Sequence, residues 1–178
     1  TLIILYIITL IYISIVERFR NYSSLIAVQG WLLLGIALLR LHTLDWMELS
    51  FIITETLIFK ALIVPGILMR VIKKTGINRI SSTGTSQFNS LMLSITALTI
   101  SAILTYYVAD QTINMIFFGV ALYALLTGLI LIVLRSRIFT HMVGFLVIEN
   151  GVFLFSMAIG VEMPLLINAA IMLDILLS

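Results

Sequence analysis

Residues 139–160, FTHMVGFLVIENGVFLFSMAIG, decide the fold class of this chain. As a helix the stretch can cross a bilayer, because about 20 residues at about 1.5 Å each span roughly 30 Å of hydrocarbon. Its apolar residues run all round the predicted helix, whereas a membrane-barrel strand would alternate apolar and polar residues over about ten positions. Glu149 lies near the middle of the stretch, with Asn150 and Gly151 after it. The sequence therefore predicts a transmembrane helix with an ionisable group at mid-depth.

The composition of the whole chain places it in lipid. Of its 178 residues, 62% are apolar and only 10% are charged, and the mean hydropathy is +1.23. A soluble domain carries about a quarter of its residues as charges, so soluble enzymes, nucleic-acid binders and disordered linkers are excluded. The chain has no Cys and two His, which argues against a haem, zinc or iron–sulfur site on this chain alone. Nucleotide-loop, HExxH and GxSxG motifs are also absent.

The apolar segments predict an all-α, polytopic transmembrane bundle of about seven helices. Residues 1–74 would hold three of them, residues 75–90 a cytoplasmic loop, and residues 91–178 the other four. Pro65 predicts a kink in the third helix, and Pro164 a start for the last. The first and last segments are short, and we therefore expect a piece of a slightly longer protein. The predicted spans are 1–16, 22–41, 47–72, 91–109, 113–134, 139–160 and 163–178.

The basic residues predict the orientation of the bundle. Eight of the ten follow the first, third or fifth predicted helix, and would therefore lie on one side of the membrane. Arg40 falls on the opposite side and Lys60 inside a span. Because cytoplasmic loops are enriched in Lys and Arg, we predict an outer N-terminus and a cytoplasmic C-terminus. The eight are Arg18, Arg20, Arg70, Lys73, Lys74, Arg79, Arg135 and Arg137.

Four charged residues stand out inside the predicted spans, away from the span ends, because an ionised side chain costs about 2.5–3.5 kcal/mol at mid-bilayer. They are Glu55, Lys60, Glu149 and Asp174. Glu149 and Asp174 lie at similar depths on consecutive helices with almost no loop between them, so both can face one seam and form a proton relay. A permanently protonated Glu149 that only donates one packing hydrogen bond is the alternative, and Asp174 could instead lie near an interface.

Lys60 is the third residue that we predict to take part in proton translocation. Glu55 is five residues away on a different helix face, so Lys60 needs a partner on another helix or another subunit. A structural ion pair that fixes helix register is the alternative role. Glu55, Gln29 and His141 are weaker relay candidates. For these the alternatives are a solvated carboxylate, an interhelical hydrogen bond and a ring wetted at the cytoplasmic interface.

Three segments resemble one known family along nearly the whole chain. RIFTHMVGFLVIENGVFLFSMAIG (137–160) and MPLLINAAIMLDILL (163–177) resemble the C-terminal half of the hydrogenase-4 component E family. TETLIFKALIVPGILMRVIKKTG (54–76) is similar to the family's third helix, which bears a lysine, a proline and a basic exit. This family is a membrane subunit of group 4 membrane-bound hydrogenase complexes. The resemblance implies a multi-pass subunit of the prokaryotic cytoplasmic membrane.

Residues 113–178 are also similar to two smaller subunits, the K subunit of complex I and the C subunit of Mrp-type antiporters. Those subunits are three-helix units with membrane-embedded acids on the second and third helices. By this likeness Glu149 takes the place of the second-helix acid and Asp174 approximates the third-helix acid. The chain departs from the complex I pattern in having Asp, where Glu is usual, on the third helix.

The resemblance implies a subunit of a redox-driven pump that moves protons or sodium ions. Its partners would be antiporter-like subunits and a hydrogenase-anchoring subunit in a hetero-oligomer, besides lipid. The chain itself would hold no catalytic centre and no cofactor, and nickel–iron and iron–sulfur centres would lie in partner subunits. One alternative is a non-conducting scaffold, in which small-residue spacings such as Ala124-x-x-x-Gly128 pack helices. Another is a subunit of a multi-subunit cation/proton antiporter.

Overall fold

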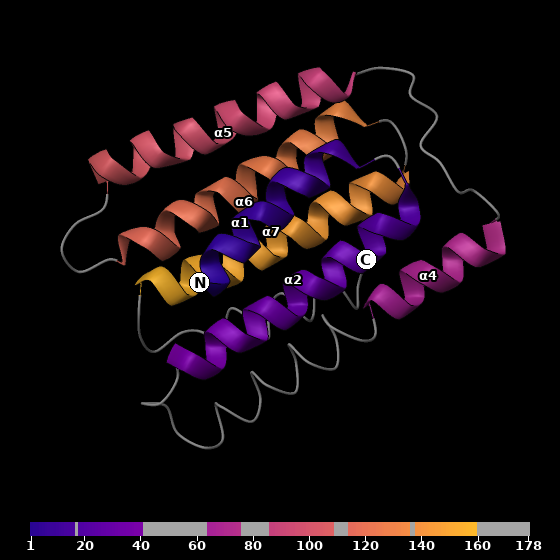
Figure 1. The fold of residues 1–178 in the computed structure, drawn as a ribbon, viewed down its shortest axis with the longest axis horizontal. Coiled ribbons are helices and arrows are strands. Elements are labelled where there is room, and N and C mark those ends of the chain that lie inside the picture. Colours follow the sequence, from indigo (N-terminus) through magenta and orange to yellow (C-terminus); the bar gives the residue numbers. More distant parts are fainter. Residues whose placement is uncertain (17, 41–63, 76–85, 109–113, 136–137, 160–178) are drawn as a thin grey trace.

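Every element that the structure describes is an α-helix (Figure 1). The structure is a computed structural model, and it describes residues 1–16, 18–40, 64–75, 86–108, 114–135 and 138–159. The predicted all-α class is therefore confirmed for this part of the chain. The helices are α1 (Leu2–Ile15), α2 (Phe19–Arg40), α4 (Val64–Thr75), α5 (Gln87–Val108), α6 (Met115–Leu134) and α7 (Ile138–Ile159).

Several of these helices are long and apolar enough to cross a bilayer. Four meet that description: Arg20–Leu39 within α2, and the whole of α5, α6 and α7. The apolar helix α1 is shorter, at 14 residues. These helices make the chain a multi-pass integral membrane protein. The total of seven spans stays a prediction, because most of the third predicted span and all of the last lie outside the described residues.

Helix α5 begins four residues before the predicted start at residue 91. The reason is the side chain of Ser86, whose Oγ accepts a hydrogen bond of 3.3 Å from the backbone N–H of Asn89. A serine in this position satisfies one of the free N–H groups of a first helical turn. The backbone N–H of Ser90 donates to the Ser86 carbonyl at 3.1 Å. Gln87, Asn89 and Ser90 therefore belong to a helix rather than to the predicted loop 75–90.

Pro65 is the second residue of α4 in the part of that helix which the structure describes. The kink stays a prediction, since residues 47–63 of that predicted span lie outside the described residues. The same holds for Pro164. Helix α4 continues to Thr75, three residues beyond the predicted end of its span.

The core lies where α1, α2, α6 and α7 meet. Helix α1 packs against α2, α5 and α6, and α2 also packs against α7 and α4. In Figure 1, α1 accordingly lies between α5 and α2, and α4 and α5 lie at opposite edges of the bundle. Large side chains from all four inner helices are fully buried, so α1 is a central packing element despite its length. They include Tyr6, Leu10, Tyr22, Leu33, Tyr123, Val143 and Phe153.

Helices α6 and α7 approach each other closely at glycine residues. A Cβ added to Gly128 would lie 2.6 Å from the backbone oxygen of Gly144, and one added to Gly144 would lie 2.8 Å from that of Gly128. Ala124, one helical turn before Gly128 in α6, packs against Gly151 of α7. A Cβ added to Gly151 would lie 3.1 Å from the Ala124 Cβ. The predicted packing role of the Ala124-x-x-x-Gly128 spacing is therefore confirmed.

Candidate functional site

Glu149 lies near the middle of α7 and faces the interior of the bundle rather than lipid. Its exposed fraction is 4%, and that of the adjacent Asn150 is 3%. It is the one carboxylate in the part of the chain that the structure describes. Acids inside membrane spans almost always face the bundle interior or a water-filled cavity, and they mark ion pathways. The location of Glu149 therefore matches that of a functional acid.

A chain of hydrogen-bonded side chains runs beside Glu149 and joins three helices. The Asn150 side-chain amide donates to Gln29 Oε1 over 3.4 Å, from α7 to α2. The Gln29 amide donates in turn to Thr9 Oγ1 over 3.2 Å, from α2 to α1. The Thr9 hydroxyl donates to the Tyr6 carbonyl at 2.7 Å. We call Thr9, Gln29 and Asn150 the amide chain.

The amide chain explains why three polar side chains can be buried in an apolar bundle. Gln29 is fully buried, and Asn150 and Thr9 are nearly so. A buried amide without a partner costs about 1–3 kcal/mol, and each of these side chains has one. The interhelical hydrogen bond, which was the alternative role for Gln29, is thus observed, and a part for Gln29 in a proton relay stays a prediction. Thr9 was not indicated by the sequence, where it is one hydroxyl residue in an apolar run.

A second polar cluster joins α1 to α5 and α6. The hydroxyl oxygens of Ser14 and Ser94 lie 3.3 Å apart, and Ser94 Oγ lies 2.6 Å from the Tyr123 hydroxyl. All three side chains are buried. The sequence contained one signal for this cluster: small residues recur on a single face of α5. These buried residues are Ser90, Ser94, Ala97 and Ser101.

His141 lies away from both clusters, in the first turn of α7. Its Nε2 donates to the backbone carbonyl of Arg135, which follows the last residue of α6. Eight residues separate His141 from Glu149 along α7, or about 12 Å at 1.5 Å per residue. The structure therefore places His141 at the α6–α7 connection and not beside the acid.

Three predicted site residues, Glu55, Lys60 and Asp174, lie outside the described residues. Their roles stay predictions. Among the described residues, no group of three or more His, Cys, Asp or Glu side chains is placed to hold a metal ion.

No protein-family model, curated protein or solved structure matches the chain.

Proposed function

We propose that the chain is an integral membrane subunit of a redox-driven ion pump of the membrane-bound hydrogenase or complex I-like type. In this proposal Glu149 takes up and releases protons during ion translocation. The observation that carries it is the burial of this carboxylate near the middle of α7, beside the amide chain. The resemblance to hydrogenase-4 component E supports the choice of pump, since the matching segments include both Glu149 and the lysine-bearing helix.

The amide chain supports a role in ion transfer as well as in packing. An amide offers both donors and acceptors, so it can hydrogen-bond with either a neutral carboxyl or a carboxylate. Moving one charge across a membrane potential is worth about 2.3 kcal/mol per 100 mV. A change of one pKa unit is worth about 1.4 kcal/mol. A change of one or two units in the pKa of a buried acid therefore involves a free energy similar to that of moving one charge across the membrane potential.

In the proposed complex, the redox chemistry takes place in partner subunits that hold nickel–iron and iron–sulfur centres. Antiporter-like subunits and a hydrogenase-anchoring subunit would adjoin this chain in a prokaryotic cytoplasmic membrane. Asp174 and Lys60 would continue the ion path on neighbouring helices, with Glu55 as a further relay group. Protons are the ion that a carboxyl group can exchange directly, and sodium is the alternative ion.

Proton pumping by the purified native complex, reconstituted in proteoliposomes, tests the role of Glu149. We expect Glu149→Gln to abolish pumping, because Gln keeps the shape and hydrogen bonds of a protonated Glu but cannot exchange a proton. Glu149→Asp is the matched control, because it keeps a carboxyl group, and we expect it to retain part of the activity. Pumping at the wild-type level in Glu149→Gln would contradict the proposal.

The metal content of the same preparation separates the proposed pump from the two alternatives. Nickel and iron in the purified complex would support a hydrogenase, and their absence with intact cation exchange would favour an antiporter. The scaffold is favoured by one observation, the close α6–α7 contact at Gly128 and Gly144. It predicts that Glu149→Gln leaves pumping unchanged and that enlarging Gly128 prevents assembly.

A further inference from the structure

One face of α7 is turned away from the helices that the structure packs against it. Ile148 lies on the side of α7 that meets Gly128 of α6, and Asn150 lies on the side that bonds Gln29 of α2. Glu149 stands between these two residues, and each residue of an α-helix is rotated by about 100° from the one before it. Glu149 therefore lies on a third side of α7, which we call the outer face. At spacings of three and four residues, the outer face consists of Ile138, Met142, Phe145, Glu149, Val152 and Ser156.

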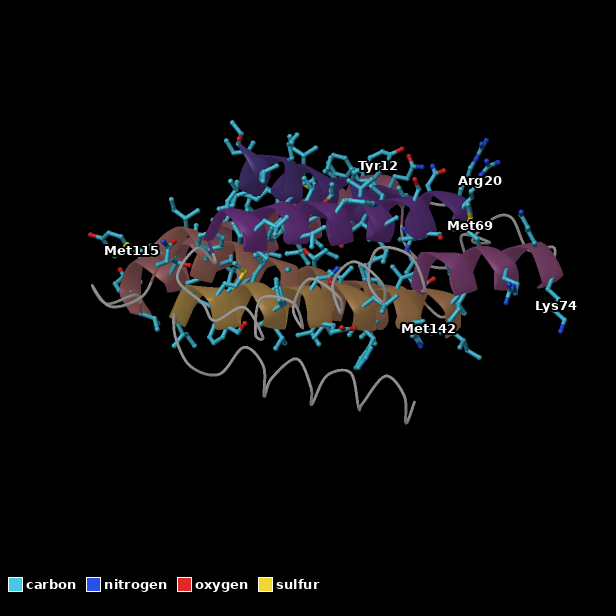
Figure 2. The ribbon with its side chains drawn as sticks, turned by 90° about the horizontal axis from the view of Figure 1, so that it is seen from below. Tyr12, Arg20, Met69, Lys74, Met115 and Met142 are labelled. Carbon is cyan, nitrogen blue, oxygen red and sulfur yellow. The ribbon has the colours of Figure 1, made fainter. Side chains whose placement is uncertain are left out.

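The exposure of the outer face falls along the helix. Ile138, at the start of α7, is 79% exposed, Met142 is 50% exposed and Phe145 is 39% exposed. Figure 2 shows Met142 on the side of α7 that faces away from α2. Glu149, on the same face, is only 4% exposed. Something must therefore cover this part of the outer face, and α6 and α2 pack against other sides of α7.

The residues that follow α7 have the length and composition to form this cover. Residues 163–178, MPLLINAAIMLDILLS, are mostly apolar, and only residues 160–162 separate them from the end of α7 at Ile159. Helices joined by so short a connection are antiparallel neighbours. A helix over residues 163–178 would be about 24 Å long, at 1.5 Å per residue. It would therefore run back beside α7 from Ile159 to about the level of Phe145.

This reach matches the exposure of the outer face. Ser156, Val152 and Glu149 lie within it, and they are half-buried or buried. Phe145 lies at its limit and Met142 lies beyond it, and exposure rises in that order. Residues 41–63 are the other long segment outside the described ranges. They lead from α2 to α4, which pack against each other, so we expect them beside α2 rather than on the outer face.

We propose that residues 163–178 pack antiparallel on the outer face of α7 and form the cover that buries Glu149. The interior that Glu149 faces is then the seam between α7 and this segment, and not the core where α1, α2, α6 and α7 meet. An ion or a water molecule would reach the carboxyl group along this seam. The packing does not depend on the proposed role in ion transfer, and it applies equally if the chain is a scaffold.

Disulfide cross-linking of the full chain in membranes tests the packing, because the chain has no cysteine of its own. In the proposed register Val152 lies opposite Ala170 and Ser156 lies opposite Leu166, and a disulfide forms only where the two Cα atoms are within about 7 Å. We expect both cysteine pairs to convert most of the protein to the cross-linked form under mild oxidation. The control pairs Ala170→Cys with Ile100→Cys, which is exposed at a similar depth on α5, beyond α6 from α7, and it should stay reduced.

A cysteine scan of residues 168–172 against Val152→Cys then locates the register, and reactive positions three or four residues apart would indicate a helix. Absence of cross-links at all five positions would overturn the proposal. Cross-linking of Val152→Cys to Ile58→Cys instead would assign the cover to residues 41–63, and cross-links only between two chains would assign it to a second copy. If Val152→Cys loses its helical circular dichroism, Ser156→Cys replaces it against residues 164–168, under the same criteria. The readout does not include pumping, so a failure of the proposed function leaves this test unaffected.

Discussion

Gln29 joins three helices through one side chain, since it accepts from Asn150 on α7 and donates to Thr9 on α1. This is the smallest unit that fixes α1, α2 and α7 relative to one another near Glu149. Because the chain is embedded in lipid, packing and interhelical hydrogen bonds, rather than a hydrophobic force between helices, decide how they associate. The position of the acid therefore depends on two amides that do not themselves ionise.

A double-mutant cycle tests whether this pair is energetically coupled. We expect Gln29→Ala and Asn150→Ala each to lower the free energy of unfolding, and the two losses to be coupled by about 0.6 kcal/mol, the usual size for such bonds in membranes. Denaturant unfolding in detergent measures these free energies of unfolding. The control pairs Gln29→Ala with Thr96→Ala, whose exposed hydroxyl bonds only its own helix, and these losses should add. Additive losses in the first pair would contradict the coupling.

The sequence indicated some residues of the site and not others, for a physical reason. Glu149 and Gln29 were predictable because a carboxylate or an amide cannot satisfy its polar atoms alone within an apolar span. Thr9 and Ser14 were not, because a hydroxyl can bond a carbonyl of its own helix, as both do here at Tyr6 and Leu10. Whether such a hydroxyl also bonds another helix depends on packing that no single segment encodes.

At the scale of the elements, the α6–α7 pair is held together by close backbone contact. A Cβ added to Gly128 would lie 2.6 Å from the backbone oxygen of Gly144. The same Cβ would lie 2.5 Å from Cγ1 of Ile148. The isoleucine side chain can move, but the backbone oxygen can move only if the helices separate. Since α7 carries Glu149 and Asn150, any separation also shifts the candidate site.

We therefore expect Gly128→Ala to destabilise the protein by about 1–3 kcal/mol, the usual cost of overpacking. Gly66→Ala is the matched control, because nothing lies within 4 Å of a Cβ added there in α4. Its effect should be neutral or slightly stabilising, since alanine favours a helix more than glycine does. Thermal unfolding followed by circular dichroism compares the two. A Gly128→Ala variant as stable as the wild type would show that the helices separate at little cost.

Helix boundaries show what local sequence can and cannot predict. The bounds of α6 lie close to those predicted from its apolar run. Asn114 caps the helix, because its Oδ1 accepts a hydrogen bond of 3.2 Å from the Phe117 N–H. The start of α5 was placed too late, because Gln87, Asn89 and Ser90 have the composition of a loop. The Ser86 cap decides that boundary, and a serine in a stretch with several serines gives no unique signal for it.

At the scale of the whole molecule, the described helices reproduce the predicted segregation of charge. The exposed cations Arg18, Arg20, Arg70, Lys73 and Lys74 share one end, whereas Arg40 ends α2 and so lies at the other. The side of the membrane that each end faces remains a prediction of the positive-inside rule. Periodicity and charge predict helices and their directions well, because each depends on one segment at a time. Contacts between distant helices depend on pairs of segments.

The absence of cysteine makes the orientation directly testable by single-cysteine labelling. Asn89→Cys places a thiol on the exposed first turn of α5, which begins at the end of the bundle where α4 ends (Figure 1). Met115→Cys places one on the half-exposed first turn of α6, at the end opposite to Arg20 and Lys74 (Figure 2). Neither variant alters a charge, so the determinants of topology stay intact. In intact cells a membrane-impermeant maleimide should label Met115→Cys and leave Asn89→Cys unlabelled until the membrane is opened. The cysteine-free parent chain controls for background labelling. Labelling of Asn89→Cys but not of Met115→Cys in intact cells would place the end that holds Arg20 and Lys74 outside.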